Sequence, residues 1–103
     1  MNITAKELKE RLASGHSLKL IDVREELEYH TFNIGGDNIP LGKLPQQSED
    51  LDFDKSGEII VLCQRGIRSR TGQQILQSAG FTNVKNLEGG LLAYRKHQLN
   101  FKL

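Results

Sequence analysis

Three short hydrophobic runs stand out along the chain, at residues 18–23, 58–62 and 84–87. Isoleucine, leucine and valine dominate the first two runs with few polar interruptions, which is typical of strands buried on both faces of a parallel sheet. A very short fourth strand is expected at residues 38–39, and it ends there because Pro40 has no N–H for a further ladder hydrogen bond. The hydrophobic pattern therefore predicts four strands.

Helical patterns separate these runs. Thr4 is followed by Glu7 at the spacing of a capping box, and Ile3 and Leu8 flank this pair as a hydrophobic staple, so a helix is expected to begin here and to end near Gly15. Further helices are expected at residues 25–30, 69–80 and 91–98, with one short irregular helix within 41–51. Strands that alternate with helices predict an α/β fold, in which helices cover both faces of a parallel sheet.

Side-chain spacing also predicts which positions are buried. The buried face of the helix at 69–80 is expected to consist of Thr71, Ile75, Leu76 and Ala79. At the end of the chain, Phe101 and Leu103 are expected to cover the core from the tail.

The composition favours one ordinary globular domain over residues 1–103. Hydrophobic residues make up 37% of the chain and charged residues 26%, which suffices for one modest core. The net charge is +1, so bulk charge gives no reason to expect nucleic acid or a membrane as a partner. No apolar stretch approaches the ~20 residues of a membrane span, and the N-terminus lacks the apolar run of a signal peptide.

Cysteine and histidine usage narrows the chemistry further. The single cysteine, Cys63, excludes an internal disulfide and favours a reducing compartment, so we expect a cytoplasmic protein. The three histidines, His16, His30 and His97, are dispersed along the chain, so no metal site is expected.

Cys63 directly follows the run at 58–62, and this position is the strongest functional signal in the sequence. A loop containing Arg65, Gly66 and Arg68 comes next, before the expected helix. Gly66 permits a tight turn whose backbone N–H groups face inward, and a helix N-terminus and two arginines add positive potential. Because this environment favours thiolate over thiol, the pKa of Cys63 should be lowered, and Cys63 is the candidate nucleophile.

The same loop indicates the class of substrate. Arginine suits the oxygens of tetrahedral anions, so we expect a small anion with an electrophilic atom, and sulfur oxyanions, phosphate esters and arsenate are all candidates. Phosphotyrosine-type phosphatases place five residues between cysteine and arginine. Here four residues separate Cys63 from Arg68, and the phosphatase position holds Ser69. The shorter loop favours transfer of one sulfur atom over a phosphoryl group.

A further candidate feature is the pair Asp22 and Arg24 at the end of the first hydrophobic run. Open α/β sheets place their sites at the carboxyl ends of strands, so we assign this pair a supporting role. A structural ion pair or a turn hydrogen bond is the more common explanation for such a pair.

Four segments of the chain resemble the single-domain rhodaneses, a family of thiosulfate sulfurtransferases. These segments occur in the family's order and spacing at residues 21–25, 34–40, 63–69 and 87–94. The family often has histidine where Asn33 stands and tryptophan where Tyr94 stands, and both departures lie outside the loop after Cys63.

The resemblance implies a three-layer α/β domain whose central, mostly parallel sheet has five strands and helices on both faces. It also implies a double-displacement reaction without a cofactor. Cys63 attacks the outer sulfur of a small anionic donor such as thiosulfate, carries that sulfur as a persulfide, and passes it to cyanide or to a thiol, for example that of a thioredoxin-like protein.

The resemblance further implies which residues bind the donor. They are the residues of the loop after the cysteine, namely Gln64, Arg65, Gly66, Ile67, Arg68 and Ser69. The two arginines are expected to clamp the anion, and Arg68 is also expected to brace the loop.

Two other functions remain open at this point. A phosphatase or an arsenate reductase uses a similar loop design, although the loop here is short. A non-catalytic rhodanese-like interaction module has the same fold and does not need the cysteine, and the intact loop with both arginines speaks against it.

Overall fold

A computed structural model describes the backbone of residues 1–101 and the side chains of residues 1–97. Its centre is one five-stranded sheet with the strand order β1-β5-β4-β2-β3, and all neighbouring strands are parallel. The strands are β1 (Asn2–Ile3), β2 (Lys19–Asp22), β3 (Asp37–Asn38), β4 (Ile59–Leu62) and β5 (Val84–Leu87). The α-helices are α1 (Ala5–Ala13), α2 (Glu26–Thr31), α3 (Leu44–Gln47), α4 (Ile67–Ser78) and α5 (Gly90–Phe101).

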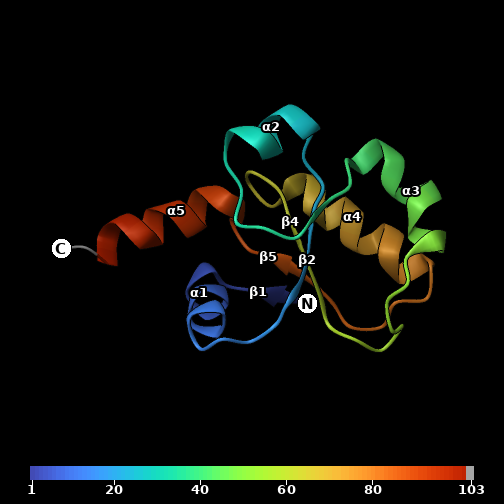
Figure 1. The fold of residues 1–103 in the computed structure, drawn as a ribbon, viewed down its shortest axis with the longest axis horizontal. Helices are drawn as coiled ribbons and strands as arrows, with labels where there is room; N and C mark the ends of the chain where they lie inside the picture. Colours follow the sequence, from blue (N-terminus) through green and yellow to red (C-terminus); the bar gives the residue numbers. More distant parts are fainter. Residues whose placement is uncertain (102–103) are drawn as a thin grey trace.

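Helices lie on both faces of the sheet, so the domain has three layers (Figure 1). One face is covered by α1 and α5, and its buried cluster consists of Ile3, Leu8, Leu20, Ile60, Leu62, Leu87 and Leu91. On the other face, α4 packs on β4 and β5, and α3 packs on α4. The buried cluster there includes Ile21, Val23, Leu44, Val61, Leu76, Phe81 and Val84. The predicted α/β class, with helices on both faces of a parallel sheet, is confirmed.

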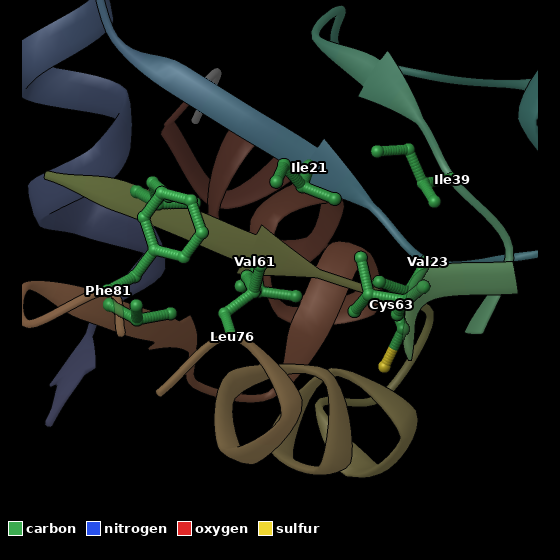
Figure 2. Packing of buried hydrophobic residues seen from close by; sticks show 10 residues of the cluster. Ile21, Val23, Ile39, Val61, Cys63, Leu76 and Phe81 are labelled. Atoms are coloured by element: carbon green, nitrogen blue, oxygen red, sulfur yellow. The ribbon is translucent and has the colours of Figure 1, made fainter. Parts of the chain in front are cut away.

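Strand β4 is buried on both faces and brings Cys63 to the carboxyl edge of the sheet. Ile59 and Val61 face the α4 side, whereas Ile60 and Leu62 face the α1 side, which explains why the run lacks polar alternation. Cys63 is the next residue and is only 1% exposed. Figure 2 shows its sulfur at one end of the packed cluster, directed toward a neighbouring helix.

At the start of the chain, helix α1 agrees with the prediction from the sequence, whereas strand β1 was not predicted. Thr4 and Glu7 form both hydrogen bonds of the predicted capping box at the start of α1. Strand β1 was not predicted from the hydrophobic pattern, because it contributes only two residues. It nevertheless extends the sheet by pairing Asn2 with Asn86 and Ile3 with Leu87.

The buried face of α4 differs from the prediction. The helix begins at Ile67, and Thr71 is exposed, so its predicted burial is wrong. Gly72 lies on the buried face, where a Cβ would stand 3.2 Å from Cγ1 of Val61. Leu76 is fully buried as predicted. The helix therefore packs closely on β4 through a residue with no side chain.

The remaining local predictions concern the middle and the end of the chain. The irregular helix expected within 41–51 is three short helical segments, η1 (Leu41–Lys43), α3 and η2 (Ser48–Asp50). The predicted core contacts of Phe101 and Leu103 lie outside the described side chains. Within the described part of the chain, no helix is both long enough and apolar enough to cross a membrane.

Candidate active site

Groups from the loop after β4 converge on the sulfur of Cys63. The backbone N–H groups of Gly66 and Ser69 donate to Sγ at 3.1 and 3.3 Å, and Oγ of Ser69 lies 3.3 Å from Sγ. Gly66 has a φ of +87°, in the left-handed region that glycine adopts without strain, so its N–H turns back toward the sulfur. Helix α4 begins at Ile67 and adds the positive end of its dipole.

These contacts outweigh the burial of the thiol. Burial raises the pKa of Cys63, whereas hydrogen bonds from the Ser69 hydroxyl and from the backbone N–H groups of Ser69, Arg65 and Gly66 lower it, and the net result is a lowered pKa. The direction agrees with the sequence prediction. The inward backbone N–H groups act as the sequence predicted, the Ser69 hydroxyl adds to their effect, and neither guanidinium is among the causes.

The Arg68 guanidinium is engaged by a carboxylate from another element. Its Nη1 and Nη2 donate to the two carboxylate oxygens of Glu28 at 2.7 and 3.0 Å, which ties α2 to the first turn of α4. The hydrogen bonds from Arg68 lower the pKa of Glu28 to about 2. Arg68 thus braces the loop, the second of its two expected roles, and the remote Glu28 had no sequence signal. Arg65 is exposed and forms no ion pair among the described side chains.

The turn between β5 and α5 supports the loop from behind. The backbone N–H groups of Leu91 and Leu92 donate to the carbonyls of Cys63 and Gln64 at 2.9 and 3.0 Å. Gly90 approaches the loop so closely that a Cβ there would lie 2.5 Å from the carbonyl carbon of Gln64. The glycine pair at this turn belonged to the segments of family resemblance, but the sequence did not reveal that it packs against the loop.

A buried polar contact joins the loop to β5. The Ser69 hydroxyl donates to Oδ1 of Asn86, and Nδ2 of Asn86 donates to the Gly66 carbonyl at 3.1 Å. Asn86 is 2% exposed. The residues predicted from the sequence did not include Asn86, although a polar side chain within a hydrophobic strand run is a signal that could have identified it.

Asp22 and Arg24 form a buried structural pair at the carboxyl end of β2. Nη2 of Arg24 lies 2.8 Å from Oδ2 of Asp22, and it also donates to the Phe32 carbonyl at 2.6 Å. Both side chains are almost fully buried. The pair therefore fixes the chain beside the loop and does not present a free charge to a substrate.

A small pocket gives access to the sulfur, and its lining residues are Cys63, Gln64, Arg65, Ile67 and Arg68. Exposed hydrophobic side chains lie at this pocket and at two hollows next to it. Ile67 lines the pocket and is 69% exposed. Leu27 is 79% exposed and lines a second hollow, which shares Gln64 with the pocket. Leu92 is 41% exposed and lines a third hollow, which shares Arg95 with the second. Apart from Met1, these three are the large hydrophobic residues that the described chain exposes. We refer to Leu27, Ile67 and Leu92 as the rim.

The described residues contain no group of three or more histidine, cysteine, aspartate and glutamate side chains that could hold a metal ion. What the site provides is a buried sulfur that faces hydrogen-bond donors. Such an environment stabilises negative charge on that sulfur.

The chain belongs to the rhodanese-like domain family, whose sequence model matches residues 4–97. It is 38% identical over 93 residues to the putative sulfurtransferase YtwF of Bacillus subtilis, and the match covers 89% of this chain and 87% of YtwF. The relatives of this chain therefore include proteins that are named as sulfurtransferases.

Two further comparisons relate the chain to one much longer protein and to one of similar length. The probable adenylyltransferase/sulfurtransferase MoeZ of Mycobacterium tuberculosis is 33% identical over 95 residues, which cover 91% of this chain and 24% of MoeZ. The chain therefore spans about a quarter of the length of that relative. The structure of the human single-domain sulfurtransferase TSTD1 matches with a TM-score of 0.80 at 26% identity, over 92% of this chain and 95% of that chain.

Proposed function

We propose that this chain transfers a sulfane sulfur from thiosulfate, or a similar small anionic donor, to a thiol or to cyanide through a persulfide on Cys63. The observation that carries the proposal is the pair of backbone N–H groups, from Gly66 and Ser69, that donate to Sγ, with the Ser69 hydroxyl 3.3 Å from the same atom. A persulfide bears its negative charge on the outer sulfur, and a loop with inward N–H groups suits that charge.

The reaction has two balanced steps. In the first, the Cys63 thiolate attacks the outer sulfur of thiosulfate, a sulfur–sulfur bond forms at Sγ, and the sulfur–sulfur bond of thiosulfate breaks with sulfite leaving. In the second, an acceptor thiolate or cyanide attacks the outer sulfur of the persulfide and takes it, and the Cys63 thiolate returns. The enzyme carries one sulfur atom between the steps and needs no other cofactor.

The compact loop favours sulfur over phosphoryl transfer. Gly66 and Gly90 both lie where a Cβ would approach backbone atoms of neighbouring segments, at 3.2 Å and 2.5 Å. A phosphatase needs an arginine for the equatorial oxygens of phosphate, but that position holds Ser69 here, and the preceding Arg68 is already held by Glu28. These contacts favour a small transferred atom, and they weigh against the phosphatase and arsenate reductase alternatives.

The rim favours a protein as the acceptor. Cyanide and thiosulfate need no hydrophobic surroundings, whereas exposed leucine and isoleucine side chains around a reactive group suit contact with another protein. We therefore favour a thiol on a protein of the thioredoxin-like class over a small acceptor. We place the reaction in the cytoplasm, where the cysteine stays reduced.

The proposal is tested by loading the protein with thiosulfate and measuring its intact mass. We expect a gain of one sulfur atom, release of that atom as thiocyanate on addition of cyanide, and neither result for Cys63→Ser. The Cys63→Ser chain should keep its circular dichroism spectrum and unfolding midpoint, because the change is nearly isosteric.

Wild-type protein alkylated with iodoacetamide is the matched control, since its sequence is unchanged and only its thiol is blocked. Absence of any mass gain, with Cys63 shown to be free and reduced, contradicts sulfur transfer. Cysteine-dependent hydrolysis of an aryl phosphate would favour the phosphatase alternative. Protein binding that survives Cys63→Ala, without transferase activity in the wild type, would favour the interaction module.

A further inference from the structure

The Ser69 hydroxyl has one proton and two neighbours that compete for it. Oγ lies 3.3 Å from Sγ of Cys63, and it donates to Oδ1 of Asn86 on the adjacent strand β5. All three side chains are at least 98% buried, so water does not replace a hydrogen bond that is lost here. A hydroxyl group donates only one hydrogen bond at a time.

The orientation of the Asn86 amide is fixed by the loop. Its Nδ2 donates to the Gly66 carbonyl at 3.1 Å, and this contact turns Oδ1 toward Ser69. Asn86 therefore presents an acceptor to the hydroxyl and cannot itself donate to Oγ without losing the Gly66 contact. In the described structure no buried side-chain polar atom is left without a partner.

The two protonation states of Cys63 use the hydroxyl differently. In the thiol state, S–H of Cys63 donates to Oγ of Ser69, the Ser69 proton goes to Asn86, and every group has a partner. In the thiolate state, Sγ accepts only. Because a charged acceptor takes the stronger hydrogen bond, the hydroxyl turns toward the sulfur, and Oδ1 of Asn86 loses its donor.

We propose that Asn86 is a positioning residue that sets the reactivity of Cys63 by competing with its thiolate for the Ser69 proton. Because Oδ1 of Asn86 loses its donor only in the thiolate state, Asn86 favours the thiol over the thiolate. It therefore opposes the backbone N–H groups, which favour the thiolate. The proposal concerns the cysteine of the proposed function and deepens that function, but its test does not require sulfur transfer.

Charged groups near the sulfur do not perform this task. Arg65 and Arg68 line the pocket at the sulfur, and the Arg68 guanidinium is paired with Glu28 of α2. Neither side chain contacts the Ser69 hydroxyl or Asn86 through a hydrogen bond in the described structure. On β2, Asp22 and Arg24 bond to each other. Neither β5 nor the described part of α5 contributes a charged side chain to the pocket at the sulfur.

Competition between Asn86 and the thiolate for the Ser69 proton keeps the thiolate nucleophilic. The nucleophilicity of a thiolate falls as its pKa falls, and the best attacking thiol has a pKa near the ambient pH. A cradle of N–H groups alone stabilises the thiolate and reduces its nucleophilicity. Asn86 limits that stabilisation while the same N–H groups stay in place for the persulfide.

The test is the pH profile of alkylation of Cys63 by iodoacetamide in the whole chain. Asn86→Leu, which keeps the size of the side chain and removes its acceptor, should lower the pKa of Cys63 by about 1 unit. Its limiting alkylation rate at high pH should fall about threefold, as the lower basicity requires. Ser69→Ala removes the hydroxyl and should raise the pKa, and adding Asn86→Leu to Ser69→Ala should give no lowering.

Asn83→Leu is the matched control, because it makes the same change just before β5, at the opposite end of the strand from the loop, and it should shift nothing. If Asn86 only braces the loop through Gly66, Asn86→Leu raises the pKa in both backgrounds, which overturns the proposal. An unchanged pKa in Ser69→Ala also overturns it, even if Asn86→Leu does not fold. These pKa shifts can appear even if the protein does not transfer sulfur. The experiment therefore distinguishes a failure of the Asn86 proposal from a failure of the proposed sulfurtransferase function.

Discussion

Gly90 shows how strongly the Cys63 site depends on backbone atoms. Its φ of +64° lies in the left-handed region, and a Cβ would lie 2.5 Å from the carbonyl carbon of Gln64 and 2.6 Å from the N atom of Arg65. Side chains are thus excluded here by both conformation and space. The position of the loop behind the sulfur is set by a residue that offers no functional group.

Gly90→Ala should therefore displace the loop. We expect the rate of sulfur transfer to fall about 100-fold, since a shift of about 1 Å in a reacting group is enough for such a loss. The measurement is thiocyanate formation from thiosulfate and cyanide. Gly42→Ala is the control, because no atom lies within 4 Å of its Cβ position. Equal activity of the two variants would contradict the role of Gly90.

At the residue scale, the sequence predicted the position of the reactive group better than the groups that control it. Cys63 and Gly66 were found because a strand end, a glycine and a following helix are close in sequence. Glu28 and Asn86 were missed because they reach the loop from positions 40 and 20 residues away, at Arg68 and at Gly66. Contacts between distant segments follow from the assembled sheet and not from local spacing.

At the element scale, β4 has an ion cluster at its start and the reactive thiol after its end. Glu58 accepts from Arg11 of α1, with Nη1 at 3.0 Å, and from Nζ of Lys85 of β5 at 2.5 Å. The hydrogen bond from Arg11 lowers the pKa of Glu58 to about 2, despite partial burial, and Lys85 adds to the effect. This cluster joins three elements at the edge opposite the thiol.

Glu58→Gln should destabilise the protein at pH 7 by about 1–2 kcal/mol, a value reduced for solvent screening. The pKa of Glu58 in the folded state lies below its usual 4.5, so its stabilisation is present above that pH and is lost as the pH falls toward 2. The measurement is the urea midpoint of wild type and Glu58→Gln at pH 7 and near pH 2. Their difference should disappear at the lower pH. Glu10→Gln is the control, and a difference independent of pH would contradict the prediction.

Helices and strands with a clear local sequence pattern were predicted. Features that depend on packing between distant segments were missed. The capping box at Thr4 and Glu7 and the run that forms β4 are local features, and both were predicted. Strand β1 is too short to show a pattern, and it exists because β5 offers an edge. The buried face of α4 was misassigned at Thr71, since the closest approach to β4 is made by Gly72, which a hydrophobic pattern does not detect.

At the scale of the whole molecule, the hydrophobic rim lines the pocket at the buried sulfur and the two hollows next to it. Leu27 projects from α2, Ile67 opens α4, and Leu92 lies in the first turn of α5, whose N–H groups hold the loop. Three separate elements thus expose hydrophobic side chains at this pocket and at the two hollows next to it. This arrangement suits a protein surface that delivers or removes a sulfur atom.

Leu27→Ser should therefore separate two acceptors. Leu27 is 79% exposed, so the change should leave the unfolding midpoint nearly unchanged. We expect transfer to reduced thioredoxin, used as a protein thiol, to slow about threefold to tenfold, because truncation of a contact residue costs on the order of 1 kcal/mol. Transfer to cyanide is the internal control and should not change. Equal slowing with both acceptors would contradict a docking role for the rim.

The short loop is enclosed on the side toward which it would have to grow. A Cβ on Gly66 would stand 3.2 Å from the Leu87 carbonyl oxygen and 3.3 Å from the N atom of Gly89, and Leu91, itself fully buried, holds the Cys63 carbonyl. Insertion of a residue would have to dislodge the beginning of α5 as well. Evolution toward bulkier anions therefore needs simultaneous changes in two distant stretches of the gene, whereas the choice of partner can drift one exposed position at a time.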